Sequence, residues 1–428
     1  MPGPLGRDLR NAPGVSAGTI SERVAEICGY RDRLAGTDAE RRLTNALKAE
    51  LESGGRRCEV EPTWVHPQWP IVHLLHCLLA VAGSIIAASE PVVGFALVLA
   101  AATSAYLDLS ARWYLLRRLL FRRASQNLLA SPPEAAGEMP RLFLCANVDA
   151  PRTGAAYTGL AARLYERAAR RLPVVSSPTR IWFWSIAALL LPIGARMAGL
   201  EATWLDCIQL VPTLVLIVAC FALGEIALSP VSPGANANAS GVAAALATAR
   251  LLDDEPPANL RVEVLLCGGG ETTMQGFRSF VRTHRRELDR ATTRFVSFES
   301  VGRGQPRFAL SGGLAVSLPL DPKLAELCAA VAIARDDEDD FDAEPIRDAR
   351  ATAAIVARSY RYPAIAITCR EDGRALPEGH HTPADVPATV DPDAVGRAAT
   401  LTADAIRLLD RDLGRTRPAT AAAEPAAT

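Results

Sequence analysis

The chain has 428 residues and a formal net charge of −1, and 49% of its residues are hydrophobic. The length exceeds one ordinary domain and the hydrophobic content is high for a purely soluble protein, so we expect part of the chain to lie in a bilayer. The balanced charge and the lack of a nucleic-acid motif predict no nucleic-acid partner.

Nine cysteines occur singly, without a Cys-x-x-Cys pair. An odd number cannot all be used in intramolecular disulfides, and this pattern favours a reducing compartment. Residues 1–20 lack the apolar core of a signal peptide and are predicted to be a disordered N-terminus. Residues 415–428 are rich in Ala, Thr and Pro and are predicted to be a disordered tail.

Residues 21–56 carry apolar positions at helical spacing among many charges. They predict two amphipathic helices, separated near Gly36 and ended by Gly54 and Gly55. Residues 58–65 then predict a strand. Helices followed by a strand are typical of an ordinary α/β unit.

Two pairs of apolar stretches follow, at residues 71–89 and 91–109 and at residues 181–200 and 207–228. Each is close to the ~20 residues that an α-helix needs to cross a bilayer. Four buried core helices are the alternative, but near-uncharged runs of this length are rare in soluble domains. We therefore expect two transmembrane hairpins with four spans.

His73 and His76 lie one helical turn apart in the first predicted span. Residues at i and i+3 face the same way, so the pair offers two imidazoles to a metal ion. Because both lie near the membrane interface, we expect them to be solvated polar residues instead.

Arginines mark one side of the two hairpins, which occupy residues 71–109 and 180–228. They follow the first hairpin and precede the second, whereas the hairpin tips hold only Arg196. Because arginine-rich segments stay in the cytoplasm, both hairpins should enter and leave from the cytoplasmic side. The rest of this multi-pass membrane protein can then assemble as one cytoplasmic domain from residues 21–70, 110–179 and 229–414.

Strand and helix patterns alternate along that domain. The predicted helices cover residues 240–252, 275–290, 322–334 and 391–412. Alternation of this kind predicts an α/β fold, with a mixed, mainly parallel sheet covered by helices on both faces. The further strands that we expect, besides 58–65, are residues 125–130, 141–147, 261–267, 293–299 and 363–369.

A loop of small residues, SPGANANASG, passes at residues 232–241 into an alanine-rich helix. Its residue types favour a tight turn, and Ser240 is expected to cap the helix that begins at Gly241. The loop resembles the Gly-Ala-Asn-Asp-Asn-Ala-Ser-Gly loop of metallopeptidase family twenty-eight. This family contains zinc aminopeptidases and is related to glutaminyl cyclase and to the transferrin receptor ectodomain.

The resemblance implies an aminopeptidase-like fold and a site for two zinc ions. Such a site needs carboxylates and imidazoles from several strand ends, one carboxylate shared by both ions, and another carboxylate as general base. The family provides them through five motifs. This chain has a version of each motif, in the same order along the chain.

The first two motifs have lost a metal ligand each. Asn147 stands where the family has a metal-binding His, while Asp149, which would orient that ligand, remains. Ala237 stands where the family has the Asp that bridges both zinc ions. An amide is a weak zinc ligand beside imidazole, and a methyl group offers no lone pair.

The third motif, a Glu-Glu pair in the family, has one carboxylate here. An alignment without gaps places Gly270 at the general base and Glu271 at the metal ligand. A shift by one residue would make Glu271 the base and Thr272 the failed ligand. The general base or one ligand is missing in either alignment.

The last two motifs keep their ligand types. Glu299 stands at a metal-binding Asp, and the final His-Thr-Pro-x-Asp motif is intact, with His381 as the ligand and Asp385 behind it. His380 is the less favoured ligand. The acidic run at residues 336–340 lacks the spacing of a calcium loop and is expected to be solvated.

The surviving residues divide into two incomplete sets, Asn147 with Glu299 and Glu271 with His381. Catalytic zinc takes about three protein ligands, so we expect no tightly bound dinuclear zinc, and zinc as a cofactor only if the protein is active. We interpret the chain as a non-catalytic relative, or pseudoenzyme, that binds a peptide, a protein or membrane lipid. The alternative is a membrane-bound zinc aminopeptidase with an altered or mononuclear site.

Overall fold

The computed structural model describes residues 16–133, 139–171, 177–336, 341–371, 373–374 and 376–416. Most of the two segments predicted to be disordered, and of the acidic run, lies outside these residues. Helix α2 (Ala17–Gly29) begins within the predicted N-terminal segment, and α13 (Pro392–Thr416) continues past residue 414.

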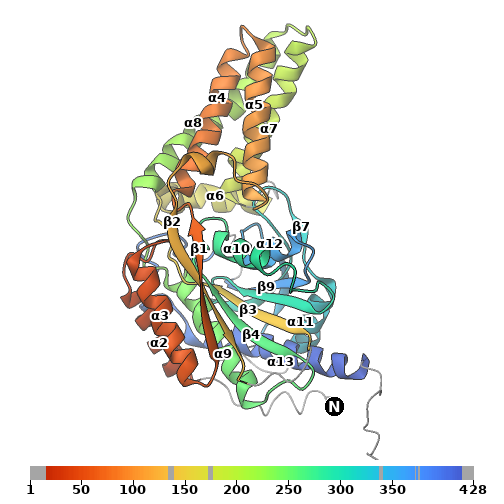
Figure 1. Ribbon diagram of the computed structural model, residues 1–428. Coiled ribbons are helices and arrows are strands. Elements are labelled where there is room, and N and C mark those ends of the chain that lie inside the picture. Colours follow the sequence, from red (N-terminus) through yellow and green to blue (C-terminus); the bar gives the residue numbers. More distant parts are fainter. Residues whose placement is uncertain are drawn as a thin grey trace, which may run out of the picture.

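A nine-stranded mixed sheet forms the centre of the domain. Its four central strands run parallel, and antiparallel strands flank them on both sides. The predicted α/β fold is therefore confirmed (Figure 1). In spatial order the strands are β1 (Arg57–Val65), β2 (Arg123–Ser131), β4 (Arg261–Cys267), β3 (Arg141–Asn147), β5 (Thr293–Phe298), β9 (Ala364–Arg370), β6 (Gln305–Gly312) and β7 (Leu318–Pro319), with β8 (Glu344–Arg347) paired to β6.

Strands β6, β7 and β8 extend the sheet beyond the six strands predicted from the sequence. Strand β6 begins with Gln305, Pro306 and Arg307, and β8 has the sequence EPIR, so neither segment shows an alternating apolar pattern. Pairing with neighbours forms these strands, since β6 lies antiparallel to β9 and parallel to β8. Tertiary contacts thus override weak local preference.

Helices cover both faces of the sheet. On one face lie α2, α13, α3 (Asp38–Ser53), α9 (Ser240–Asp254) and α11 (Pro322–Ala334), and on the other α10 (Gln275–Thr283) and α12 (Ala353–Ser359). Small residues bring α9 close to the sheet. A Cβ atom at Gly241 would lie 2.7 Å from the Phe298 carbonyl oxygen, so only glycine permits this approach.

Four apolar helices form a bundle that projects from the domain (Figure 1). Helix α4 (Trp69–Ile86) packs on α5 (Pro91–Leu109) and α8 (Thr203–Leu228), and α7 (Pro178–Met197) packs on α5 and α8. All four helices are long and apolar enough to cross a membrane. Large apolar side chains also face outward, among them Leu191 and Phe221, each 77% exposed. Such exposure is expected of a surface that contacts lipid.

His73 and His76 are not solvated, contrary to the sequence-based expectation. They are 3% and 0% exposed, and both rings pack against Trp182 of α7. The Nε2 atom of His76 lies 2.9 Å from the Ser104 hydroxyl on α5. The two imidazoles are part of the contact between the two hairpins, where the Trp182 ring packs on both and the Ser104 hydroxyl is a polar partner of His76.

Candidate functional site

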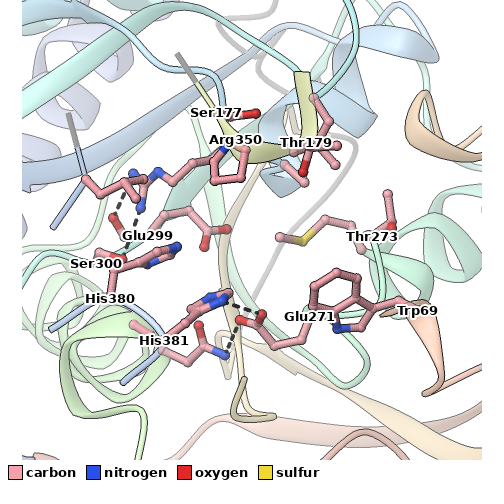
Figure 2. A pocket seen from close by; sticks show the side chains of 18 of the residues that line it. Trp69, Ser177, Thr179, Glu271, Thr273, Glu299, Ser300, Arg350, His380 and His381 are labelled. Atoms are coloured by element: carbon pink, nitrogen blue, oxygen red, sulfur yellow. Dashed lines mark hydrogen bonds and ion pairs between the residues drawn. The ribbon is translucent and has the colours of Figure 1, made fainter. Parts of the chain in front are cut away.

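The candidate site lies where the parallel strands end, below the helical bundle. A cavity of about 130 Å³ opens there, and the domain supplies one wall of it while the bundle supplies another. The bundle side is lined by Trp69 of α4 and by Ser177 and Thr179 at the start of α7 (Figure 2). His73 of α4 also lines the cavity. The carboxyl ends of parallel strands are the usual place for a ligand in an α/β sheet.

Asn147 and Glu299 meet at the ends of two neighbouring strands. Asn147 is the last residue of β3 and Glu299 directly follows β5. The Asn147 side-chain amide donates to both carboxylate oxygens of Glu299, at 3.3 and 3.4 Å. Burial raises the pKa of Glu299 well above its usual range. Where the family has a zinc ligand, this chain has an amide that holds a carboxyl group.

Glu271 lies on the opposite side of the same cavity (Figure 2). The Asn238 amide donates to its Oε1 atom at 3.0 Å, and His381 Nε2 lies 3.6 Å from its Oε2 atom. Burial, reinforced by the charge of Asp149, raises the pKa of Glu271 to about 8. The group therefore carries a proton at neutral pH.

Asp149 and Asp385 hold the two loops that frame the cavity. The Asp149 carboxylate accepts from the backbone N–H groups of Gly270 and Glu271, at 2.8 and 3.0 Å. The Asp385 carboxylate accepts from those of Asn236 and Ala237, at 2.6 and 3.1 Å. Burial raises the pKa of both aspartates to about 6. Both side chains thus position loops and do not face the cavity.

Arg33 is a supporting residue that no sequence motif indicated. Its guanidinium group is 1% exposed and donates to the carbonyl oxygens of Pro233 and Gly234, at 2.7 and 2.9 Å. Asp149 and Asp385 are the nearby carboxylates that offset its charge. Arg33 therefore fixes the start of the loop that carries Ala237.

Ser240 does not cap the helix, contrary to the prediction. A π-helical turn at Ala235–Ala239 precedes α9, so the backbone is already helical when it reaches Ser240. The Ser240 hydroxyl instead donates to the Asn236 carbonyl oxygen at 2.8 Å and accepts from the N–H group of Val301 at 3.1 Å. Ser240 joins this loop to the segment after Glu299.

The structure shows why position 270 has no side chain. A Cβ atom at Gly270 would lie 2.2 Å from Cγ of Asn147, so the Asn147 side chain occupies that space. Thr272, the failed ligand in the shifted alignment, is 1% exposed, and its hydroxyl donates to the Gly269 carbonyl oxygen. Gly270 and Glu271 line the cavity, whereas Thr272 does not.

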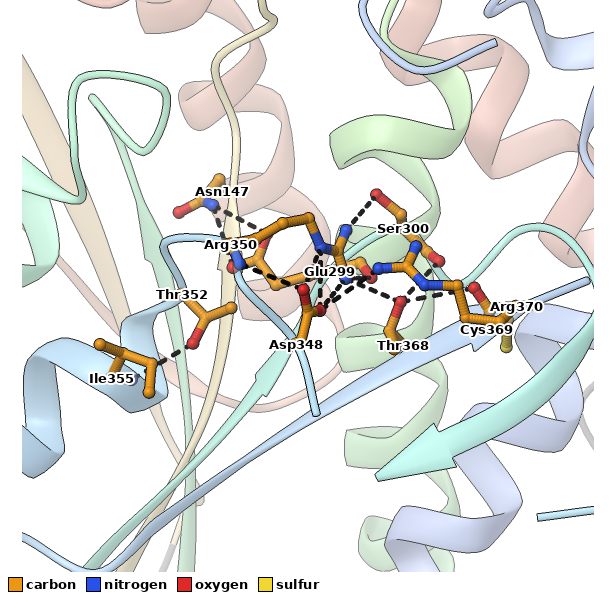
Figure 3. Close-up of polar contacts among 10 residues, drawn as sticks. All are labelled: Asn147, Glu299, Ser300, Asp348, Arg350, Thr352, Ile355, Thr368, Cys369 and Arg370. Atoms are coloured by element: carbon orange, nitrogen blue, oxygen red, sulfur yellow. Dashed lines mark hydrogen bonds and ion pairs between the residues drawn. The ribbon is translucent and has the colours of Figure 1, made fainter. Parts of the chain in front are cut away.

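Arg350 is a cavity residue that the sequence analysis missed, because arginine in a loop is normally exposed. Its guanidinium group donates to Asp348 at 2.6 Å, to Thr368 at 2.9 Å and to Ser300 at 3.0 Å (Figure 3). Burial acts to raise the pKa of Asp348, but Arg350 and Arg370 hold it well below its usual range. This cluster places a fixed positive charge beside Glu299.

His380 and His381 stack on each other, with ring centres 3.8 Å apart. Tyr157 lies edge-on to both rings. Burial and the charge of Arg350 lower the pKa of His381 to about 3, so the imidazole is neutral. Within the described part of the chain, the buried Nδ1 atoms of both histidines have no hydrogen-bond partner. The cavity therefore keeps polar atoms that a bound ligand could satisfy.

Residues 222–406 match the model of Peptidase family M28. The predicted resemblance to this family is confirmed. Comparison with curated proteins gave no match.

Solved structures show the same M28-like fold. A leucine aminopeptidase precursor and a glutaminyl cyclase bound to N-acetylhistamine, both from Bacteroides thetaiotaomicron, each have 14% identity and a TM-score of 0.53. The matches cover 93% of this chain and 98% and 99% of the two structures. A zinc aminopeptidase from Bacillus subtilis has 11% identity and a TM-score of 0.54, covering 94% of this chain and 96% of that one. At such identities the likeness establishes the fold.

The residues of this M28-like site do not fit a two-zinc centre. Ala237 supplies no ligand at the bridging position, and asparagine amides hold both Glu271 and Glu299. Glu271 and His381 face each other, with Oε2 and Nε2 3.6 Å apart, a distance that one metal ion could span. Across the described ranges, no three His, Cys, Asp or Glu residues gather as a metal site. The absence of tightly bound dinuclear zinc in solution stays a prediction.

Proposed function

We propose that the protein is a membrane-embedded, non-catalytic relative of the M28 peptidases, and that its cavity binds a peptide or protein segment at the membrane surface. One observation carries the proposal. Asn147 and Ala237 stand where the family has two metal ligands, and the Asn147 amide hydrogen-bonds the carboxyl group of Glu299. A metal-activated water is the nucleophile of such hydrolases, so the loss of the ligands removes both the nucleophile and the oxyanion stabilisation.

The cavity itself is retained, which favours a binding role. Asp149 and Asp385 still hold the two loops, and Glu271, His380 and His381 still present polar atoms to the cavity. At neutral pH the Glu271 carboxyl group is protonated and the two imidazoles are unprotonated, because burial shifts their pKa values. All three side chains are therefore uncharged. They suit a ligand with uncharged hydrogen-bonding groups, such as a peptide backbone.

The location of the cavity supports a partner at the membrane. Residues of α4 and α7 form part of its wall, so a ligand would contact both the domain and the ends of two apolar helices. We place the domain in the cytoplasm, because arginines dominate the helix ends on its side.

Hydrolysis of aminoacyl-anilides tests the non-catalytic proposal. The wild-type protein should show no cleavage that a metal chelator abolishes. The alternative, an aminopeptidase with one metal held by Glu271 and His381, predicts chelator-sensitive cleavage that Glu271→Gln abolishes. Glu22→Gln on the surface of α2 is the matched control. Chelator-sensitive cleavage by the wild type would overturn the non-catalytic proposal.

Impermeant maleimide labelling tests the orientation. Cys207 is exposed near the tip of the second hairpin, and Cys58 lies in β1 of the domain. In right-side-out cells Cys207 should react and Cys58 should react only after permeabilisation. Labelling of Cys58 in intact cells would place the domain outside the cytoplasm. Single-cysteine versions of the chain keep the two signals separate.

A further inference from the structure

A second cavity, lined by other residues than the candidate site, lies beside the first hairpin. It is open to the surface, has a volume of about 510 Å³, and is bordered by the end of β1, by the segment between α5 and β2, and by α10. Figure 1 shows α10 and the upper ends of β1 and β2 next to the base of the bundle. We call it the arginine pocket, after the four arginines that line it: Arg118, Arg122, Arg278 and Arg282.

The lining of the pocket is positively charged. Among the described residues that line it there is no Asp or Glu. Within the described residues, none of its four arginines forms an ion pair, although such pairs are common elsewhere in the molecule. Arg278 is half-buried and the other three arginines are exposed. Like charges that lie close together repel each other, and a bound anion would relieve this repulsion.

Aromatic and backbone contacts hold two of the arginines in place. Arg122 lies over the Trp64 ring at 4.9 Å, and Arg278 lies over the Tyr114 ring at 4.3 Å. Arg278 also donates from Nη2 to the Arg112 carbonyl oxygen at 2.6 Å. Its Nε atom is buried and has no partner in the described part of the chain. Positioned guanidinium groups with free donors are suited to phosphate, which accepts two parallel hydrogen bonds.

The pocket adjoins the expected membrane surface. Its lining residue His66 lies three positions before α4, and Tyr114 lies five positions after α5. Large apolar side chains around it are exposed, among them Trp113 at 60%, Leu119 at 75% and Phe121 at 58%. Aromatic and apolar groups beside arginines are characteristic of the interface between lipid tails and headgroups.

We propose that the arginine pocket binds the phosphate group of an anionic phospholipid in the leaflet that faces the domain. The acyl chains would then lie against Trp113, Leu119 and Phe121, on the exposed side of the same segment. The proposal rests on the membrane embedding argued above. It does not depend on whether the candidate site is catalytic.

Binding of short-chain lipids to the purified full-length protein in a neutral detergent tests this. The probes are dihexanoyl phosphatidylglycerol, dihexanoyl phosphatidylcholine and inorganic phosphate, and binding is read by native mass spectrometry. Phosphatidylglycerol should bind at least about tenfold more tightly than either of the others, because only it combines net negative charge with acyl chains. Equal binding of phosphatidylcholine would overturn the charge argument, and equal binding of inorganic phosphate would overturn the lipid assignment.

A matched pair of variants locates the site. Arg118→Gln with Arg282→Gln removes two charges from the pocket and should weaken phosphatidylglycerol binding about tenfold or more. Arg285→Gln with Arg286→Gln removes two exposed charges that do not line the pocket and should leave binding within about twofold. Equal weakening by both pairs would show attraction to general surface charge and overturn the proposal.

A separate experiment distinguishes failure of the membrane-spanning hairpins from failure of the arginine pocket. Release of the protein from membranes by alkaline carbonate would contradict the spanning hairpins, whatever the lipid titration shows. Retention in the membrane together with no preference for phosphatidylglycerol would contradict the arginine pocket alone.

Discussion

Ionisable side chains are buried both where the first hairpin joins the domain and in the candidate site. At the junction they pair with an opposite charge, whereas Glu271 in the site has uncharged partners. At the junction, Arg117 donates to the Asp108 carboxylate at 2.6 and 2.8 Å. It also donates to the Thr272 carbonyl oxygen at 3.1 Å and to the Thr273 hydroxyl at 2.6 Å. In the candidate site, by contrast, Glu271 has a neutral amide and a neutral imidazole as partners.

This difference distinguishes side chains that stabilise the fold from side chains that are available to bind a ligand. A charge paired within the fold holds two elements together, and Arg117 joins α5 to the loop that carries Glu271. Groups that stay neutral through shifted pKa values, and keep unpaired atoms, are free to meet a ligand. Changes at the junction should therefore reduce stability most, whereas changes in the cavity should alter pH dependence and binding.

The largest effect is expected from Asp108→Ala. The change leaves the fully buried Arg117 guanidinium without its partner, which costs about 3–5 kcal/mol. Thermal unfolding in detergent, followed by tryptophan fluorescence, measures the loss. Asp108→Leu combined with Arg117→Met removes both charges and should be less harmful. Glu52→Ala, which breaks an exposed pair with Lys48, should change the unfolding temperature little. An equal loss in the single and the double variant would contradict the ion-pair account.

Gly270→Ala should have a smaller effect, about 1–3 kcal/mol, because its Cβ atom overlaps the Asn147 side chain. Asn147→Gly in the same chain removes the overlapping atoms and should recover part of this loss. Thermal unfolding of both variants measures the difference. Gly29→Ala is the control, since a Cβ atom there would meet nothing within 4 Å. A Gly270→Ala variant as stable as wild type would show that the loop is not packed as described.

Glu271→Gln should change how the unfolding temperature depends on pH. Its effect on the unfolding temperature at low pH should be smaller. The folded-state pKa of Glu271 is about 8, above its ordinary value, so the unfolded chain ionises first. Its contribution to stability is complete below its ordinary pKa, near 4.5, and is lost as the pH rises through about 8. The variant should therefore lose less unfolding temperature than wild type between pH 5 and pH 9. Parallel curves for the two proteins would contradict a raised pKa.

Sequence patterns could predict much of the fold because its central elements carry local signals. The strand at residues 141–147 and the helix at 322–334 have continuous apolar runs bounded by turns, and the hairpins have length and hydropathy. Strand β6 lacked such a signal, since Pro306 and Arg307 interrupt it and its partner β9 lies more than fifty residues away. Ser240 was misread because the turn before it is already helical.

In the candidate site, too, some residues carry a local sequence signal and others depend on tertiary contacts. Motif order singled out Asn147, Glu271, Glu299 and His381. In the structure the last three line one cavity, and Asn147 hydrogen-bonds Glu299. His381 lies beside Glu271. Motif order could not locate Arg350. Its position depends on hydrogen bonds to Asp348 and to Thr368 of strand β9. Contributions from Trp69 and His73 depend on how the bundle meets the domain, which no local pattern encodes.

Zinc content is the most direct test of the central claim that Asn147 and Ala237 have replaced two metal ligands. The protein is purified without chelator, equilibrated with zinc and desalted, and zinc per chain is then measured. Wild type should retain none, whereas Asn147→His combined with Ala237→Asp should retain zinc, because it restores one imidazole and the bridging carboxylate beside Glu299, Glu271 and His381. Two equivalents of zinc in the wild-type protein would contradict the account.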